Sequence, residues 1–286
     1  MRFTLLTLYL IIMLMQTTEA QNKYATCLTA TPVLHTGDFE SVFGGTDGKT
    51  VRTDKEGLIR DLEYIAFKGT VFEILEEIDK GDHKIYKVRT DNYDYNTSLY
   101  IDSRFVNISN EKPKMNAVKL PSKDEIYDFL DKAVGSKYCW GGNYIKGIDK
   151  MLTYYKPSGN ISQDMKDLWT LKGCDCSGLM YEATNGYSER NTSKLINYGQ
   201  PVNIEGLNAE QIIDKLELLD MIVWNGHVIY VYDKHTAIQS SLSKGGVVKT
   251  ELLETIENIM KKRKPVNDYD SSSGERFVVR RWYDTK

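Results

Sequence analysis

Short apolar stretches separated by turn-forming residues make up the first part of the chain. These stretches are rich in β-branched and aromatic side chains, and Lys-Gly, Asp-Lys-Gly-Asp and Asp-Asn sequences divide them. The four clearest lie at residues 65–67, 70–75, 84–88 and 99–101. Strands of this length and spacing are typical of a small antiparallel β-barrel. We therefore expect an all-β domain over residues 21–110.

The pattern changes at a polar linker in which Pro113 prevents a further strand. Residues 122–134 then carry apolar side chains at helical spacing. Ser122 and Glu125 form a capping box in front of them. The pattern predicts a helix that ends at Gly135.

The later part of the chain combines helices with strands. Apolar periodicity predicts one helix over residues 208–218 and another over 252–260, and a last strand is expected at 276–280. Helices that precede a run of antiparallel strands are typical of an α+β domain. We place this domain at residues 111–286 and expect an α+β fold preceded by the barrel.

Charge gives no reason to expect a nucleic-acid partner. The chain has 37 Lys and Arg residues against 40 Asp and Glu residues, a formal net charge of −3. Its only basic cluster, residues 261–264, follows the apolar run 252–260, where positive side chains complement a helix C-terminus. We expect a monomer that needs no cofactor.

Residues 1–20 have the pattern of a secretory signal peptide. Arg2 precedes an apolar core at residues 5–15, and residues 18–20 provide the small side chains that a signal peptidase reads. The core is too short for a membrane anchor, and no later stretch reaches the ~20 apolar residues of a spanning helix. We expect an exported protein, periplasmic or secreted, with no integral membrane segment after signal removal.

The stretch with the clearest chemical potential is Gly-Cys-Asp-Cys-Ser-Gly-Leu-Met, residues 173–180. From Ser177 the apolar residues follow a helical spacing up to Gly186, which suits a C-terminal cap. Cys176 therefore stands at a predicted helix N-terminus, where the helix dipole should lower the thiol pKa below its free value of about 8.5. The backbone N–H groups there are also available to an oxyanion. Cys176 is the candidate nucleophile.

A histidine that could act as its base comes later in the chain. His227 follows an Asn-Gly turn and opens an alternating strand, and the next strand is expected at residues 236–240. A polar residue beside the far imidazole nitrogen would fix the tautomer. Gln239 and His235 are the candidates, and we choose Gln239 because an orienting residue must be held rigidly on a strand.

The other cysteines have ordinary explanations. Cys139 and Cys174 are expected in the core, and in an exported protein Cys27 could pair with either of them. A zinc site made of Cys174, Cys176 and His227 would lack a fourth ligand and the usual paired spacing, so we expect no metal. Among the remaining residues of interest, we expect His35 and His83 at the surface and Trp140 in the core.

Three stretches in this order resemble the signatures of NlpC-type cell-wall peptidases, which are papain-like cysteine hydrolases of bacterial peptidoglycan. They are Tyr-Cys-Trp-Gly-Gly at residues 138–142, Asp-Cys-Ser-Gly-Leu at 175–179 and Asp-Met-Ile-Val-Trp-Asn-Gly-His-Val at 220–228. The resemblance covers residues 120–241, under half of the chain. It implies Cys176 as nucleophile, His227 as base and Gln239 at the third position, where many members carry a second histidine.

The resemblance also implies substrate contacts. In members that cut after a D-glutamyl residue, the acidic residue before the nucleophile and the serine after it bind the substrate amine, which here are Asp175 and Ser177. Tyr138 would lie beside the thiol. Residues 144–172 are longer than is usual between these motifs, and we expect them to form a lid or a wall of the groove. Residues 68–75 resemble the bacterial SH3-like domains that often precede such catalytic domains.

The expected function is hydrolysis of peptidoglycan stem peptides or muropeptides between D-glutamate and the diamino acid. If the barrel closes one end of the groove, only peptides with a free N-terminal L-alanine should fit. Two alternatives stay open at this point. One is a wall-binding protein with a silent papain-like domain, and the other is an amidase or acyltransferase of the same fold.

Overall fold

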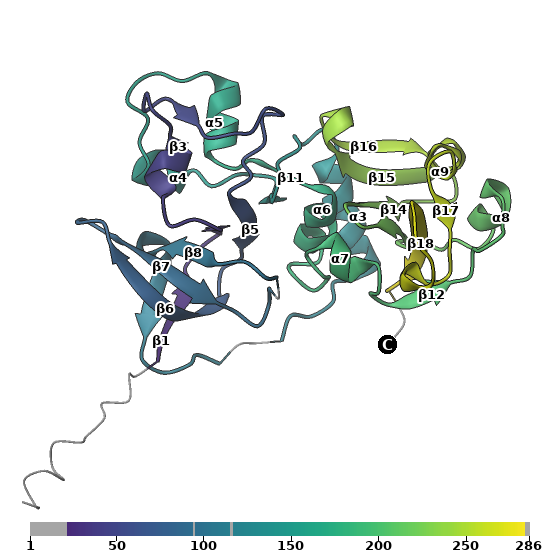
Figure 1. The fold of residues 1–286 in the computed structure, drawn as a ribbon, viewed down its shortest axis with the longest axis horizontal. Helices are drawn as coiled ribbons and strands as arrows, with labels where there is room; N and C mark the ends of the chain where they lie inside the picture. Colours follow the sequence, from purple (N-terminus) through teal and green to yellow (C-terminus); the bar gives the residue numbers. More distant parts are fainter. Residues whose placement is uncertain (1–21, 94, 115–116, 284–286) are drawn as a thin grey trace, which may run out of the picture.

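The computed structural model describes residues 22–93, 95–114 and 117–283. The expected signal peptide at residues 1–20 lies outside this part of the chain. Two bodies lie side by side: an N-terminal one built on a β-sheet, and a C-terminal one in which helices cover a second sheet (Figure 1). The strands of both main sheets pair antiparallel, apart from one short parallel pair at an edge. The fold class is α+β, as the sequence predicts.

The N-terminal body is a seven-stranded sheet in the order β5-β2-β8-β7-β6-β1-β9. Its strands are β1 (Lys23–Cys27), β2 (Thr31–Leu34), β5 (Leu62–Ala66), β6 (Val71–Asp79), β7 (Lys84–Arg89), β8 (Leu99–Asp102) and β9 (Val106–Ser109). Shorter elements complete it: α2 (Phe39–Val42), β3 (Phe43–Gly44), β4 (Thr50–Val51) and η1 (Ser103–Phe105). All four strands predicted from the sequence are present. Below we call this body, residues 22–110, the barrel after its predicted fold; its closure into a barrel and its SH3-like nature stay predictions.

Residues 145–172 follow the linker in sequence but pack against the N-terminal body. They include α4 (Lys150–Tyr154) and α5 (Gln163–Trp169). Met151, Trp169 and Leu171 are fully buried, and they belong to the same hydrophobic cluster as Phe39 and Phe105 of the barrel. The lid or groove wall expected of residues 144–172 is therefore wrong, because the apolar side chains of this segment complete the core of the N-terminal body.

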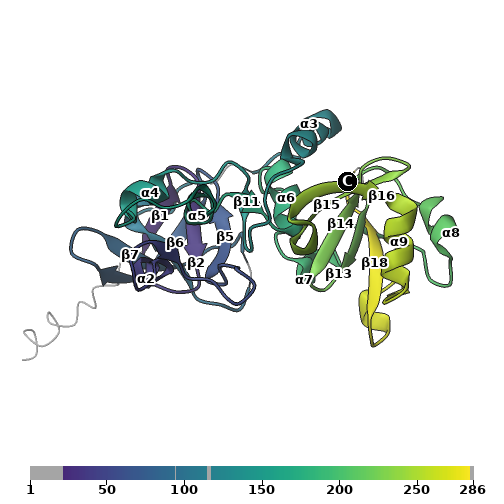
Figure 2. The ribbon, with the colours of Figure 1, turned by 90° about the horizontal axis from the view of Figure 1, so that it is seen from above.

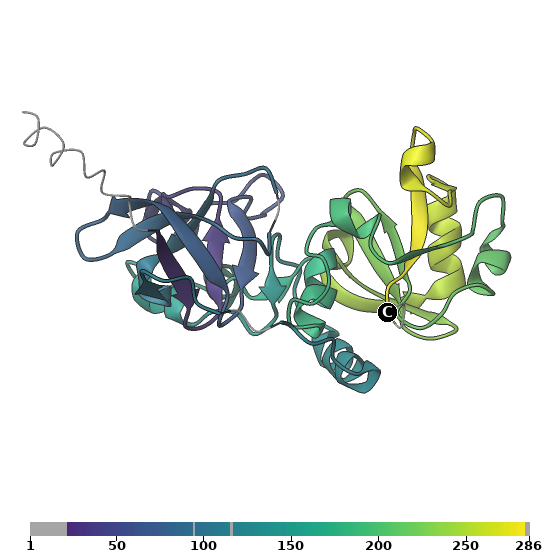
Figure 3. The same ribbon diagram turned by 90° about the horizontal axis from the view of Figure 1, so that it is seen from below.

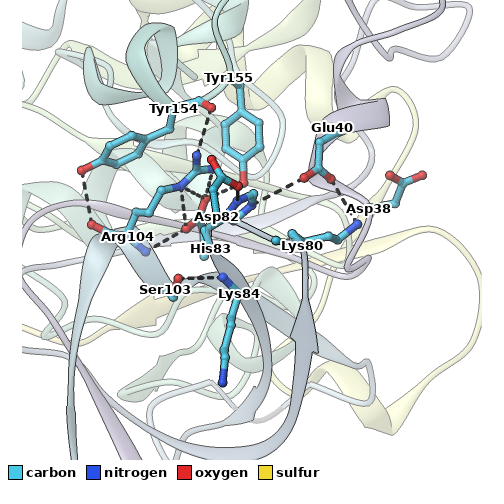
Figure 4. A network of polar contacts seen from close by, with 12 residues as sticks. Asp38, Glu40, Lys80, Asp82, His83, Lys84, Ser103, Arg104, Tyr154 and Tyr155 are labelled. Atoms are coloured by element: carbon cyan, nitrogen blue, oxygen red, sulfur yellow. Dashed lines mark hydrogen bonds and ion pairs between the residues drawn. The ribbon is translucent and has the colours of Figure 1, made fainter.

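A buried polar network fastens the same segment to the barrel (Figure 4). Arg104 Nη2 donates to Asp102 Oδ2 at 2.6 Å, and the Tyr155 hydroxyl donates to the same oxygen at 2.5 Å. Arg104 Nη1 donates to the Tyr154 carbonyl at 3.2 Å. Asp102 is fully buried, so its charge needs these donors. His83 belongs to this network with only 6% of its side chain exposed, and its expected surface position is wrong.

The C-terminal body contains a second seven-stranded sheet in the order β12-β18-β13-β14-β15-β16, with β17 beside β18. Its strands are β12 (Gln200–Val202), β13 (Met221–Trp224), β14 (His227–Val231), β15 (Thr236–Ser241), β16 (Gly246–Glu251), β17 (Lys264–Pro265) and β18 (Arg276–Arg281). The short helical turns α7 (Thr192–Leu195), η2 (Leu242–Lys244) and η3 (Tyr269–Ser271) lie between them in the chain.

Helices cover both faces of this sheet (Figure 2). The helices α3 (Lys123–Ala133) and α6 (Cys176–Ala183) contact each other, and α6 packs on β14 and β15. On the other face, α9 (Leu252–Met260) packs on β15 and β16 and contacts α8 (Ala209–Ile213). Seen from below, α3 extends beside the junction of the two bodies (Figure 3). Both faces of the sheet are therefore apolar, with a separate core on each side.

Sequence capping signals place the helix starts better than the helix ends. The predicted capping box of Ser122 and Glu125 is present at the start of α3. A second box at Asn208 begins α8, but α8 ends at Ile213 and not near residue 218. The N–H of Glu217 donates to the carboxylate of Asp220 at 2.9 Å, and this bond belongs to a turn that takes the place of the last predicted helical turns.

An edge strand of the N-terminal body is contacted by the chain that leads to α6. The side chain of Asn143, in β10 (Asn143–Tyr144) opposite β11 (Gly173–Cys174), accepts the Ile65 N–H and donates to the Ile65 carbonyl, each at 2.8 Å. It thereby occupies part of the free edge of β5. Gly141 has a positive φ of 68°, and a Cβ there would lie 2.3 Å from the Leu62 carbonyl oxygen. Glycine is therefore required where the chain crosses the barrel edge.

Candidate active site

Cys176 is the first residue of α6, directly after the N-cap residue Asp175. Asp175 Oδ1 accepts the Gly178 N–H at 2.7 Å, as a helix cap does. Gly178 has no room for a side chain, because a Cβ there would lie 2.0 Å from the Gly142 carbonyl oxygen. The first turn of α6 thus packs directly against the backbone of Gly142. The predicted position of Cys176 at a helix N-terminus is confirmed.

The expected lowering of the Cys176 pKa is not found. Burial, followed by the charge of Asp175, raises the pKa of the Cys176 thiol to about 12. Hydrogen bonds from the backbones of Val228 and Ser177 and the charge of Arg190 act in the opposite direction. Desolvation outweighs the helix N-terminus, so the resting thiol is protonated. A base has to remove this proton during a reaction.

His227 begins β14 and stands opposite Trp224 across a two-residue turn. Its Nε2 lies 2.9 Å from Gln239 Oε1 on the neighbouring strand β15. Because that oxygen is an acceptor, Nε2 carries the proton and Nδ1 keeps a lone pair. Burial lowers the pKa of His227, while the bond to Gln239 opposes this shift. His227 is therefore neutral at neutral pH and able to accept a proton.

Val228 brings His227 and Cys176 together. Val228 follows His227 in β14, and its backbone hydrogen bonds to the Cys176 thiol. The turn before His227 is fastened from the other side, since the Gly226 N–H donates to Thr192 Oγ1 at 3.0 Å. The predicted nucleophile and the predicted base therefore lie at the same end of the sheet.

His235 does not join this group. It is exposed in the turn before β15, and its backbone N–H donates to Asp233 Oδ1 at 2.8 Å. It lines a separate cavity of about 540 Å³, together with Leu252 and Tyr283. The structure thus brings Gln239, and not His235, into contact with His227.

Asp175 and Ser177 are engaged by Arg190, a residue that the sequence analysis did not single out. Arg190 Nη2 lies 2.7 Å from Asp175 Oδ2, and Nη1 lies 3.0 Å from Asp175 Oδ1. Nη1 also donates to Ser177 Oγ at 2.9 Å. All three side chains are buried. The free carboxylate implied for a substrate ammonium group is therefore absent at Asp175, because Arg190 already neutralises it.

A cavity of about 390 Å³ opens over Cys176, and both bodies line it. The C-terminal body contributes Tyr138, Trp140, Asp175, Cys176, Ser177, Arg190 and Asn225, among others. The barrel contributes His35, Arg60, Leu62, Glu63, Tyr93 and Tyr95. None of the lining residues comes from residues 144–172. The barrel itself, and not the expected lid, forms the opposite wall.

Glu63 gives this cavity a second carboxylate. It accepts a hydrogen bond from the Tyr93 hydroxyl at 2.9 Å, and its other oxygen lies 3.1 Å from His35 Nδ1. Neither partner carries a permanent positive charge. Glu63, unlike Asp175, is therefore not already paired with a guanidinium. His35 was expected to be an ordinary surface residue, but it belongs to this wall.

Two aromatic residues of the first motif lie in the same cavity. Burial, with the charges of Asp175 and Cys176, raises the pKa of the Tyr138 hydroxyl, which is therefore a neutral hydrogen-bond donor beside the thiol. Trp140 is 39% exposed, and the Arg60 guanidinium lies 4.1 Å from its ring centroid. The expected core position of Trp140 is wrong, because it forms part of the rim between the two bodies.

All four cysteines, Cys27, Cys139, Cys174 and Cys176, are buried and free. The disulfides considered for Cys27 are therefore not present. Among residues 22–93, 95–114 and 117–283, no group of three or more His, Cys, Asp or Glu side chains is arranged to hold a metal ion. Within the same residues, no helix has the length and apolar character that crossing a membrane requires.

No protein-family model matches the chain, and no curated protein does. Among solved structures, the chain is similar to an NlpC/P60 family protein from Bacillus cereus, with 14% identity and a TM-score of 0.35 over 92% of this chain. The match covers 64% of that protein, just under two thirds of its length. An NlpC protein from Trichomonas vaginalis gives 14% identity and a TM-score of 0.31 over 91% of this chain and 68% of that one. The chain is also similar to the peptidoglycan hydrolase RipB from Mycobacterium tuberculosis, with 21% identity and a TM-score of 0.32. That match covers 45% of this chain and 57% of RipB.

Proposed function

We propose that this protein is a cysteine peptidase that hydrolyses peptidoglycan peptides. The observation that carries the proposal is the grouping of Cys176, at the start of α6, with His227, whose tautomer is set by Gln239. A protonated thiol beside a neutral imidazole suits general-base activation of the nucleophile. The shared cavity between the barrel and α6 provides the substrate site.

The first half of the reaction forms a thioester. The Cys176 Sγ–H proton passes to Nδ1 of His227 as the sulfur attacks the carbonyl carbon of the scissile amide. We expect the backbone N–H of Cys176, the first residue of α6, to stabilise the resulting oxyanion. The C–N bond then breaks, and the leaving amine takes the proton from Nδ1. Gln239 holds the imidazole by its other nitrogen throughout.

The second half regenerates the enzyme. A water molecule gives a proton to Nδ1 of His227 while its oxygen attacks the thioester carbonyl. The C–S bond breaks, the sulfur recovers the proton, and a carboxylic acid leaves. The reaction consumes one water and needs no metal or cofactor from the protein.

The substrate is a stem peptide or muropeptide cut between D-glutamate and the diamino acid. This choice is supported by the resemblance of the three motifs to NlpC-type peptidases and by the barrel wall of the cavity. The N-terminal body lines the cavity opposite Cys176, and this wall leaves room for only a short peptide on the acyl side of the cut. We place the free N-terminal ammonium group of that peptide at Glu63, because Asp175 is already paired with Arg190. The natural setting would be an exported protein, acting as a monomer.

The test is incubation of the purified protein with free L-alanyl-γ-D-glutamyl-diamino acid tripeptide, followed by mass analysis of the products. We expect a dipeptide and a free diamino acid from the wild type and from Cys139→Ala, and no products from Cys176→Ala. Cys139 is a matched control, because it is equally buried and stands next to Tyr138 of the same cavity. Equal loss in both variants would contradict the assignment of the nucleophile.

The barrel wall makes a further test of specificity possible. Blocking the tripeptide amine by N-acetylation should abolish cleavage, and Glu63→Gln should raise KM for the free tripeptide far more than it lowers kcat. If blocked and free peptides are cut equally fast, the groove is open at this end. Binding of the wall without cleavage of any muropeptide would instead favour a silent wall-binding protein.

A further inference from the structure

Arg190 is buried at the centre of the junction between the nucleophile and the barrel. It is 4% exposed and lines both the Cys176 cavity and a neighbouring cavity of about 330 Å³. Two tyrosines of the barrel, Tyr64 and Tyr93, lie close enough to interact with its charge, and their rings stack with centroids 4.4 Å apart. A guanidinium is costly to bury, so a structural use for it must offset that cost.

The contacts of Arg190 converge on the residues either side of the nucleophile. Its two terminal nitrogens, Nη1 and Nη2, donate to the two carboxylate oxygens of Asp175, and Nη1 also donates to Ser177 Oγ. A longer contact of 3.4 Å joins Nη2 to the Gly142 carbonyl, the same oxygen that packs against Gly178. The planar guanidinium thus holds Asp175 before Cys176, Ser177 after it and the backbone carbonyl of Gly142.

Asp175 also presents an electrostatic problem that Arg190 resolves. As an N-cap it must be a good acceptor, but its carboxylate stands next to a sulfur that becomes negative when it attacks. Two negative groups in a buried site repel each other strongly. The Arg190 guanidinium, bidentate on Asp175, offsets this repulsion without removing the cap.

Resting on the proposed function of Cys176, we propose that Arg190 is a positioning residue for the nucleophile. It holds Asp175 and Ser177 in place around Cys176 and supplies the positive charge that permits a thiolate beside Asp175. Nothing in the motifs of the sequence assigns this role to it.

The thiolate is also influenced by other titratable and charged groups around it. They are Tyr138, Asp175, Arg190 and Tyr230, with His227 directly before Val228, whose backbone hydrogen bonds to the thiol. Only Arg190 among them has a permanent positive charge. Its removal therefore has a predictable sign, whereas the tyrosines and His227 stay neutral at neutral pH.

The test measures alkylation of Cys176 by iodoacetamide at several pH values from 7 to 9, with the modified cysteine identified by peptide mass. Loss of the Arg190 charge should disfavour the thiolate by about one pKa unit, which slows alkylation about tenfold at each pH in Arg190→Gln. Arg190→Lys keeps the charge and should stay within about threefold of the wild type. Cys176→Ala gives the background from the other thiols.

A merely structural role for Arg190 makes the opposite prediction. Loosening the fold around a buried thiol exposes it, so Arg190→Gln would then react as fast as the wild type or faster, and this result would overturn the proposal. If Arg190→Gln does not fold, Asp175→Asn is compared with the double variant Asp175→Asn/Arg190→Gln, which differs from it only at Arg190. Slower alkylation of the double variant supports the proposal, and equal or faster alkylation overturns it.

Failure of this inference can be told apart from failure of the proposed function. If the wild-type Cys176 is alkylated and the muropeptide is cut, the nucleophile stands whatever Arg190→Gln shows. If the folded wild type neither cuts the tripeptide nor is alkylated at Cys176, the proposed peptidase is wrong, and the role of Arg190 falls with it.

Discussion

Replacing Asp175 by asparagine should destabilise the fold strongly while leaving the helix cap in place. Asparagine caps a helix about as well as aspartate, so the bond to the Gly178 N–H can persist. What disappears is the charge opposite Arg190, whose side chain is 4% exposed. At a charge separation of about 4 Å and an effective dielectric constant of about 20, the lost attraction is about 4 kcal/mol. This agrees with the loss of about 3–5 kcal/mol expected when one partner of a buried pair is removed.

The assay is urea unfolding followed by circular dichroism. With an m-value of about 3 kcal/mol/M, a loss of 3–5 kcal/mol lowers the unfolding midpoint by about 1–1.7 M. Asp164→Asn is the matched control, because Asp164 pairs with Lys137 at 2.6 Å but its side chain is 89% exposed. That exposed pair should contribute less than about 1 kcal/mol. If both variants lose the same small amount, the Asp175–Arg190 pair is not the buried anchor described above.

Three further predictions concern the base and a buried acid. Because burial lowers the pKa of His227, kcat/KM should be constant near neutral pH and decrease only as the pH falls below the ordinary histidine value of 6.5. A decrease that begins above pH 6.5 contradicts this prediction. Gln239→Ala should lower kcat at least about tenfold by releasing the imidazole, whereas the exposed His235→Ala should match the wild type; the reverse order would show that the wrong partner has been chosen. Burial raises the pKa of Glu182 to about 7 from 4.5, so the native state binds the extra proton and the free energy of unfolding falls as pH rises from 4.5 to 7. Glu182→Gln keeps an acceptor for the Ile145 N–H and should flatten this decline, which urea unfolding at pH 5 and 8 measures.

Local sequence signals predicted the starting points of the elements and the nucleophile. The capping residues Ser122, Asn208 and Asp175 act on neighbours three residues away, so the sequence contains both halves of each interaction. The Asn-Gly turn before His227 is local in the same sense. These short-range signals are the reason that Cys176 and His227 could be proposed without a structure.

The rest depends on contacts between distant parts of the chain. Arg190 is a lone arginine in a turn, and no periodicity or motif connects it with Asp175. Glu63 lies in the barrel, and it lines the cavity where Gly141 packs against the barrel edge at Leu62. Burial of Cys176, which reverses the expected direction of its pKa shift, follows from packing by α6 neighbours and the sheet, and no local pattern encodes it.

The packing of residues 145–172 into the barrel has a consequence for how the chain folds as it is made. The barrel strands end at Ser109, but Trp169 and Leu171 of its core are synthesised later. At a synthesis rate of about 5–20 residues per second, roughly 3–12 s pass before these residues are made, and during this time the apolar interior of the barrel is incomplete. The N-terminal third therefore has no finished core of its own during synthesis. The growing N-terminal body is exposed to misfolding and proteolysis until residues 145–172 have been synthesised.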